Sequence, residues 1–332
     1  MIEMEFRTIV DIEDPGFRIG ACEEMLFVGS CFADKIGARF TEEKFRTIVN
    51  PFGVMYNPAS VLHTIQRVYN GQCTLSTVQS DLQTVQSDLQ SDCPQTVQTV
   101  QSDLQSDCLQ TVQSDLQSDC PLFTDLQSVK TAFLTLGTNH VYRLKETGEI
   151  VDNCQKRPQS LFTEEILSVD ECAHYLQQAI SLLLTANPAM HIVLTVSPIR
   201  YRKYGYHGSQ LSKATLLLAV DKVIKMFNVQ CSMFNVHYFP AYEIVNDELR
   251  DYRFYAEDML HPSAQAVEYI WQRFSEVYLS DEAKAFIKEW QPLKAALNHK
   301  PFNPDSDEYR QFMDKTMLKI AALQKKYPNF AG

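Results

Sequence analysis

Short apolar runs alternate with amphipathic segments along most of this chain. Buried strands are predicted where the runs are rich in Val, Leu, Ile and Phe, at 26–29, 132–136, 192–196 and 233–236. Helices are predicted where apolar residues recur at helical spacing, at 58–69, 169–184 and 211–227. Asn57 and Ser209 are the predicted N-caps of the first and third of these helices. Strands that alternate with helices indicate an α/β fold with a mainly parallel sheet covered on both faces.

The C-terminal part of the chain has a different pattern. Long helices are predicted over 263–290 and 305–327, separated by a proline-containing segment. We expect the first to close the sheet and the second to lie on the surface. The chain therefore divides into an α/β domain over residues 1–280 and a helical extension over residues 281–332.

A tandem repeat at 77–122 interrupts the first domain. Its units are near-identical copies related to TVQSDLQ, which indicates a recently duplicated insert. Apolar residues fall at heptad spacing, but Pro94 and Pro121 interrupt the pattern and each unit has little to bury. We predict a flexible or partly helical surface insert, and a helix that binds a partner remains the alternative.

The composition is that of an ordinary globular protein, with 45% hydrophobic and 21% charged residues. A net charge of −11 and the lack of a Lys/Arg cluster argue against a nucleic acid as the main partner. No apolar stretch approaches the roughly 18 residues of a membrane-spanning helix, and the first residues lack a signal-peptide pattern. We therefore expect a soluble cytoplasmic protein without a membrane partner. No His/Cys pair has zinc-ligand spacing, so no metal is expected.

The predicted strand at 26–29 ends in Gly29-Ser30 and leads directly into a helix-compatible segment. A serine at such a junction has its hydroxyl at the carboxyl edge of the sheet, beside a helix N-terminus, where a nucleophile can be held. The same position suits a helix N-cap, a role that serine commonly takes. From these two residues alone, both roles of Ser30 remain open.

A carboxylate and an imidazole that could act with Ser30 occur far downstream, at Asp258 and His261. Their spacing allows the carboxylate to orient one ring nitrogen while the other faces the serine, as in a Ser-His-Asp hydrolase. Taken alone, the pair is also typical of a helix cap beside a surface histidine.

Acyl transfer requires hydrogen-bond donors for a tetrahedral oxyanion. We predict that the backbone N–H groups of Ser30 and Gly53 supply them, together with the side-chain amide of Asn139. Gly53 lies in a predicted turn, and Asn139 follows the strand at 132–136. Either turn could instead be purely structural, since glycine suits any tight turn.

The segment Gly29-Ser30-Cys31-Phe32-Ala33 resembles the name-giving motif of the GSCFA family, whose members are similar to SGNH/GDSL-type esterases. Further matches span nearly residues 5–275 outside the repeat and include 50–53, 136–138, 197–200 and 258–263. The resemblance implies a three-layer α/β/α fold, with Ser30, Asp258 and His261 as the triad of an ester hydrolase or acyltransferase. It implies an acylated carbohydrate as substrate and requires no metal or organic cofactor.

Three further residues are predicted to contact substrate. Gln155 stands where the family has a histidine, so this chain lacks a titratable group there. Arg200 and His207 follow the strand at 192–196, as does Lys213, and we expect all three on the rim of the site. Arg200 could bind a carboxylate, phosphate or sugar, or form a salt bridge on the rim. The alternative to an enzyme is a binding protein that keeps the fold without the chemistry.

Overall fold

The computed structural model of this protein describes residues 7–70, 126–152, 154, 157–230, 235–304 and 306–330. The repeat at 77–122 and Gln155 lie outside the described residues. The central element is a five-stranded sheet in the order β2-β1-β3-β7-β8, whose neighbouring strands are all parallel. Its strands are β1 (Glu24–Gly29), β2 (Arg46–Val49), β3 (Thr131–Leu136), β7 (His191–Val196) and β8 (Val236–Tyr238).

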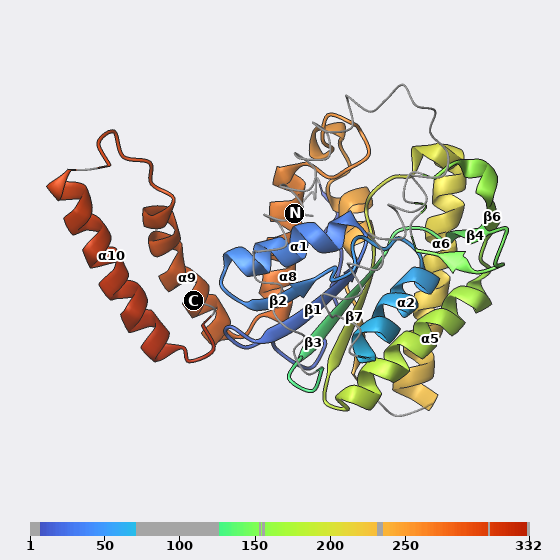
Figure 1. The fold of residues 1–332 in the computed structure, drawn as a ribbon, viewed down its shortest axis with the longest axis horizontal. Coiled ribbons are helices and arrows are strands. Elements are labelled where there is room, and N and C mark those ends of the chain that lie inside the picture. The colour runs from blue at the N-terminus through green and yellow to red at the C-terminus, as the bar shows by residue number, and fades with distance from the viewer. Residues whose placement is uncertain are drawn as a thin grey trace, which may run out of the picture.

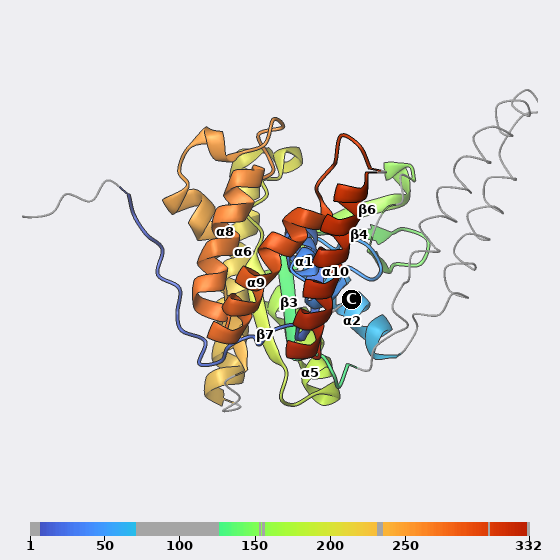
Figure 2. The ribbon, with the colours of Figure 1, turned by 90° about the vertical axis from the view of Figure 1, so that its left-hand side faces the viewer.

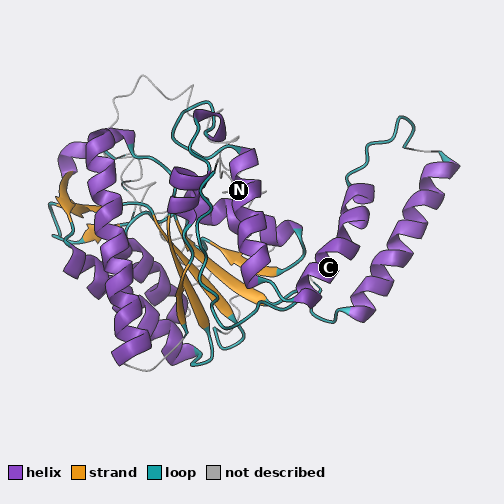
Figure 3. Ribbon diagram, turned by 180° about the vertical axis from the view of Figure 1, so that it is seen from behind, coloured by secondary structure: helices purple, strands orange, loops and turns teal. Residues whose placement is uncertain are grey.

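Helices cover both faces of this sheet (Figures 1 and 3). One face carries α2 (Pro58–Tyr69), α5 (Val169–Ala186) and α6 (Gly205–Lys225), and the other carries α1 (Cys31–Glu42) and α8 (Ala264–Tyr278). Neighbouring strand residues point to opposite faces. Accordingly, Leu26 and Val28 of β1 join the core under α2, α5 and α6, whereas Met25 and Phe27 join the core under α1 and α8. These layers confirm the predicted three-layer α/β/α fold with a mainly parallel sheet.

The predicted strands at 26–29, 132–136 and 192–196 are confirmed as β1, β3 and β7. The strand predicted at 233–236 begins later, because β8 covers Val236–Tyr238, and residues 231–234 lie outside the described residues. The edge strand β2 was not predicted.

Two of the helix predictions need correction. The helix predicted at 211–227 begins at Gly205, so Ser209 lies inside α6 and its Oγ accepts a hydrogen bond from Tyr201 N at 3.2 Å instead of capping the helix. The single helix predicted at 263–290 is two helices, α8 and α9 (Asp281–Leu297), because Ser280 starts the second as its N-cap. Asn57 is confirmed as the N-cap of α2, with Oδ1 accepting from Ser60 N at 2.9 Å.

The C-terminal helices α9 and α10 (Asp307–Lys326) form a hairpin that lies beside the α/β layers in Figure 1 and faces the viewer in Figure 2. The hairpin is attached through the core under α1 and α8, to which Phe286 and Trp290 of α9 and Ile320 of α10 belong. In addition, Trp290 Nε1 donates to the carbonyl oxygen of Glu42 at the end of α1, at 2.9 Å. No helix in the described ranges is long and apolar enough to cross a membrane.

A second, antiparallel sheet that was not predicted follows β3. It has the order β5-β4-β6 and consists of β4 (His140–Leu144), β5 (Ile150–Val151) and β6 (Phe162–Ile166). Short helical turns complete the described structure at Gln159–Leu161, Arg202–Tyr204, Met226–Gln230, Ala241–Glu243, Ile244–Glu248 and Tyr252–Phe254. Because β4 starts four residues after β3 ends, the small sheet stands at the carboxyl edge of the large one.

Two histidines pack against each other in β7 and β8. His191 Nδ1 and His237 Nε2 lie 3.3 Å apart, and Phe17 stacks on His191 with ring centroids 3.8 Å apart. Burial lowers the pKa of both rings. For His237, burial together with the neighbouring His191 lowers the pKa to about 4. Glu13 and Asp14 line the small cavity that His237 also lines. The folded state therefore favours two neutral rings.

We expect the free energy of unfolding to fall as the pH drops from 6.5, the ordinary pKa of histidine, to about 4. In this window the unfolded chain binds a proton at His237 that the folded chain excludes, whereas above pH ~6.5 neither state holds it. Each pKa unit corresponds to ~1.4 kcal/mol of unfolding free energy for a fully buried group. Because the His237 ring is partly exposed, we expect the free energy of unfolding to fall by about 1–2 kcal/mol. Urea unfolding at about pH 7 and about pH 4.5 measures this loss.

His237→Gln should lose less stability than the wild type between these two pH values. His174→Gln is the matched control, because His174 is exposed on α5. Equal losses in all three proteins would contradict the assignment.

Candidate active site

Ser30 lies where the chain leaves β1 and enters α1. β1 has β2 on one side and β3 on the other, so its carboxyl end is the switch point at which parallel α/β sheets bind ligands. Ser30 Oγ accepts a hydrogen bond from Phe32 N at 3.3 Å, which confirms the role of Ser30 as N-cap of α1. The hydroxyl keeps its own proton for donation, so the cap and a nucleophile are compatible. Ser30 is 0% exposed in this state.

Asp258 and His261 form a tightly bonded acid–base pair. His261 Nδ1 lies 2.5 Å from Asp258 Oδ2, while Asp258 Oδ1 accepts the backbone N–H groups of Leu260 at 2.8 Å and His261 at 2.9 Å. The backbone N–H of His261, that of Leu260 and the imidazole together hold the pKa of Asp258 well below its usual range. Asp258 is therefore ionised, and it fixes the imidazole so that Nε2 is the nitrogen left for another partner.

The loop that carries this pair contacts two elements at the carboxyl edge of the sheet. Lys35 Nζ of α1 donates to the carbonyl oxygen of Pro262 at 3.2 Å. Arg200, after β7, donates from its backbone N to Leu260 O at 3.1 Å and from its guanidinium to Met259 O at 3.2 Å. The acid–base loop is therefore fixed against the helix that Ser30 begins.

The three predicted oxyanion donors are all hydrogen-bonded within the protein. Ser30 N donates to Thr135 O at 3.1 Å, and Gly53 N donates to Asn50 O at 2.8 Å. Asn139 Nδ2 donates to Leu167 O at 2.7 Å, and the residue is 2% exposed. Each backbone group has only one proton, so neither backbone donor is free for an oxyanion in this state.

Arg200 is held by aromatic rings and carbonyl groups. Its guanidinium lies 4.2 Å from the ring centroid of Tyr206 and 5.2 Å from that of Tyr255. It also lines a cavity of about 410 Å³ together with Tyr242 and Tyr252. His207 is exposed in the first turn of α6 and lines neither this cavity nor the larger one described below. Gln155 lies outside the described residues.

Lys213 does not lie on the rim, contrary to the prediction. The residue is 2% exposed, and its Nζ donates to Gly137 O at 2.6 Å and to Ser197 O at 2.7 Å. These carbonyl groups directly follow β3 and β7, so the buried amine ties together two loops at the carboxyl edge. Burial lowers the pKa of Lys213 to about 7. Lys213 therefore holds these two loops in place and is not on the rim of the site.

A cavity of about 600 Å³ lies at this edge of the sheet and was not predicted. Tyr56 and Thr138 line it together with residues of the antiparallel sheet and of the segment before α6. The Tyr56 hydroxyl lies 3.4 Å from Cys31 Sγ, which connects the cavity wall to the residue after Ser30, although Ser30 and Cys31 do not themselves line the cavity. Within the part of the chain that the structure describes, no group of three or more His, Cys, Asp or Glu side chains is arranged to hold a metal ion.

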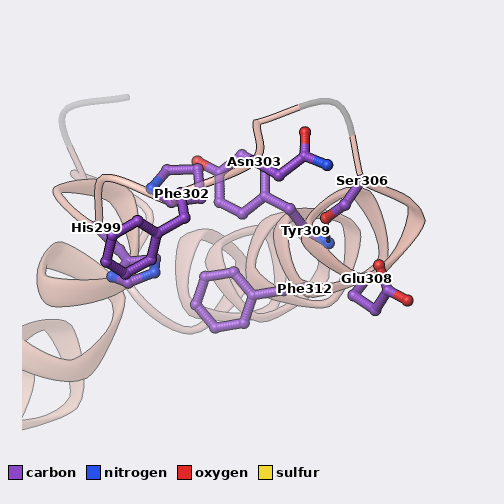
Figure 4. Close-up of a pocket in the computed structure, with 8 residues that line it drawn as sticks. His299, Phe302, Asn303, Ser306, Glu308, Tyr309 and Phe312 are labelled. Atoms are coloured by element: carbon purple, nitrogen blue, oxygen red, sulfur yellow. Dashed lines mark hydrogen bonds between the residues drawn. The ribbon is translucent and has the colours of Figure 1, made fainter.

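Another cavity, of about 520 Å³, lies at the tip of the C-terminal hairpin (Figure 4). His299, Phe302 and Phe312 line it, and Figure 4 shows their rings on one side of the α9–α10 connection. Ser30, Asp258 and His261 line neither this cavity nor the one of about 600 Å³. The candidate active site is placed at the carboxyl edge of the sheet because Ser30 follows β1 there and the acid–base loop is bonded to α1.

Comparison with known proteins relates most of the chain to one family. Residues 24–274 match the model of the GSCFA family, and residues 290–331 match that of the C-terminal domain of GSCFA domain proteins. No curated protein matches the chain.

Two solved structures are similar at low identity. One, from Streptococcus pneumonia, is provisionally described as a platelet activating factor (16% identity, 45% of this chain, 59% of that chain, TM-score 0.30). The other is the acetyl xylan esterase Est2A from the rumen bacterium Butyrivibrio proteoclasticus (10% identity, 55% of this chain, 41% of that chain, TM-score 0.27). The chain thus spans less than two thirds of either protein.

Proposed function

Because the chain belongs to the GSCFA family, as its Gly29–Ala33 motif predicted, we propose that it is a serine ester hydrolase or acyltransferase acting on an acylated carbohydrate. The observation that carries the proposal is the Asp258–His261 pair. An ionised carboxylate bonded to Nδ1 holds the imidazole in the tautomer that a general base requires.

In the proposed reaction, His261 Nε2 takes the proton of the Ser30 hydroxyl as Oγ attacks the ester carbonyl carbon. The tetrahedral intermediate collapses when the imidazolium returns that proton to the departing alcohol oxygen, which leaves an acyl group on Ser30. Water or an acceptor hydroxyl then attacks the acyl carbon, with His261 again as base, and frees the serine. Asp258 stays ionised throughout and balances the imidazolium charge.

This mechanism requires two changes from the state described. Substrate must gain access to Ser30, which is 0% exposed. In addition, Ser30 N and Gly53 N must exchange Thr135 O and Asn50 O for the oxyanion. The same observations favour the rival function, a binding protein of this fold in which Ser30 serves only as a helix cap.

A fluorophosphonate probe distinguishes the two functions, because it labels only an activated serine. We expect the wild type to be labelled and Ser30→Ala to show no labelling and no hydrolysis of p-nitrophenyl acetate above background, a loss of at least about 10³-fold. Labelling should fall sharply in His261→Ala as well.

The matched control is Ser280→Ala, because Ser280 also caps a helix, with its Oγ accepting from Ala283 N at 3.1 Å. Both serine variants lose about 1 kcal/mol of capping energy, but only the Ser30 variant should lose labelling. If the well-folded wild type is not labelled and does not hydrolyse the ester, the binding function replaces the enzymatic one.

A further inference from the structure

The cavity of about 600 Å³ at the carboxyl edge of the sheet is lined in large part by two elements of different kind. The antiparallel sheet supplies His140, Tyr142 and Glu164, and the turn before α6 supplies Lys203 and Tyr204. A cavity of this size is in the range of small-molecule sites. None of these five residues has a role in the proposed acyl transfer.

Aromatic rings form a continuous wall of this cavity. Tyr204 stacks on His140 with ring centroids 3.6 Å apart, and Tyr201 lies parallel to Tyr204 at 5.9 Å. Lys203 Nζ lies 4.5 Å from the ring centroid of Tyr142 and donates to its hydroxyl. Rings fixed in this way present rigid flat faces, which bind ligands with little loss of side-chain entropy.

The charged groups of the cavity neutralise one another. Glu164 accepts from His140 Nδ1 at 2.9 Å and from Lys203 Nζ at 3.2 Å. Burial alone would raise the pKa of Glu164, but the hydrogen bonds from Lys203 and His140 lower it. Arg157 and Asp152 line the cavity as a further cation and anion. The cavity therefore offers both donors and acceptors without an excess of either charge.

Such a lining suits a neutral molecule with many hydroxyl groups. A sugar hydroxyl both donates and accepts, and the C–H face of a sugar ring is apolar and packs on an aromatic face. A fatty acyl chain would take the partly exposed Glu164 and Lys203 out of water without bonding to them, which is costly. A phosphate or carboxylate ligand would meet Glu164 and Asp152 as well as the cations.

We infer that this cavity binds the carbohydrate part of the ester, with the sugar ring against the aromatic wall that Tyr204 helps to form and the sugar hydroxyls on Glu164 and Lys203. The inference rests on the proposed function for the identity of the reacting group. The sugar would enter beside Tyr56, whose hydroxyl contacts Cys31 next to the nucleophile. The cavity then selects the alcohol component of the ester, and Ser30 receives the acyl group of the same ester.

Binding of sugars that carry no ester tests the site without any chemistry. Xylotriose, cellotriose, maltotriose and octanoate are each titrated into the full chain by calorimetry and by saturation-transfer NMR. We expect at least one trisaccharide to bind, with a dissociation constant that Tyr204→Ala raises about 10-fold through loss of this part of the aromatic wall. Lys203→Met should also weaken binding, and because that side chain is 48% exposed its loss should not affect folding.

Tyr69→Ala, an exposed tyrosine at the end of α2, is the control that should bind as the wild type does. The inference is overturned if no trisaccharide binds, or if octanoate is the ligand that responds to Tyr204→Ala. It is also overturned if sugar binding depends on Tyr252 of the smaller cavity instead. Sugar binding without serine labelling would leave this site standing and reject the esterase. Serine labelling without sugar binding would support the esterase and reject the sugar site.

Discussion

An Asp258→Asn variant is expected to hydrolyse p-nitrophenyl acetate about 10³–10⁴-fold more slowly than the wild type while remaining folded. Its amide oxygen can still accept the backbone N–H groups of Leu260 and His261, so the loop keeps its shape. The amide nitrogen that replaces Oδ2 cannot accept the proton of His261 Nδ1. The imidazole then changes tautomer, and Nε2 carries a proton where the serine needs a base.

Steady-state kinetics separate this effect from a loss of binding. The fall should be in kcat with KM nearly unchanged, because the carboxylate acts on the imidazolium that forms in the transition state. Asp251→Asn is the matched control, since Asp251 Oδ1 accepts a backbone N–H from Arg253 at 2.9 Å and its side chain is similarly exposed. If both variants retain activity alike, the Asp258–His261 pair is a structural turn and the binding function is favoured.

The interior of the sheet could be predicted from the sequence, and its edges could not. β1, β3 and β7 are covered on both faces, so nearly every residue in them is buried and most are apolar. β2 has no such signal, because its residues are only partly buried or exposed. β6 is similar, since three of its five residues are exposed and two of these three, Thr163 and Glu164, are polar. The small sheet that lines the cavity was therefore invisible to a search for apolar runs.

The residues of the candidate site also differ in how well the sequence predicts them. Asp258 and His261 are bonded within one short loop, so their spacing in the sequence carries the information. The cavity wall brings together Tyr56, Tyr142 and Tyr204, and only the tertiary fold makes them neighbours. Lys213 is the clearest failure, because a lysine in an amphipathic helix is expected in water. Here two carbonyl groups at the ends of strands take the place of water around its amine.

Replacing Gly29 with alanine is expected to lower the free energy of unfolding by more than about 4 kcal/mol, enough to prevent stable folding. The backbone at Gly29 has φ +144°, in the region that favours glycine, and an added Cβ would lie 2.1 Å from Thr135 O. The carbonyl cannot move away cheaply, because it accepts the backbone N–H of Ser30 at 3.1 Å. The clash is with backbone atoms of the neighbouring strand β3, so no side-chain rotation relieves it.

Gly148→Ala isolates the conformational part of this cost. Gly148 has φ +72°, but an added Cβ there meets nothing within 4 Å, so the variant should lose only about 1–2 kcal/mol. Soluble expression and thermal unfolding of the two variants give the comparison. Equal stabilities would mean that β1 and β3 can separate where Ser30 begins α1. A much larger loss for Gly29→Ala would show that the glycine before Ser30 is required by the close approach of the two strands, whatever chemistry the serine performs.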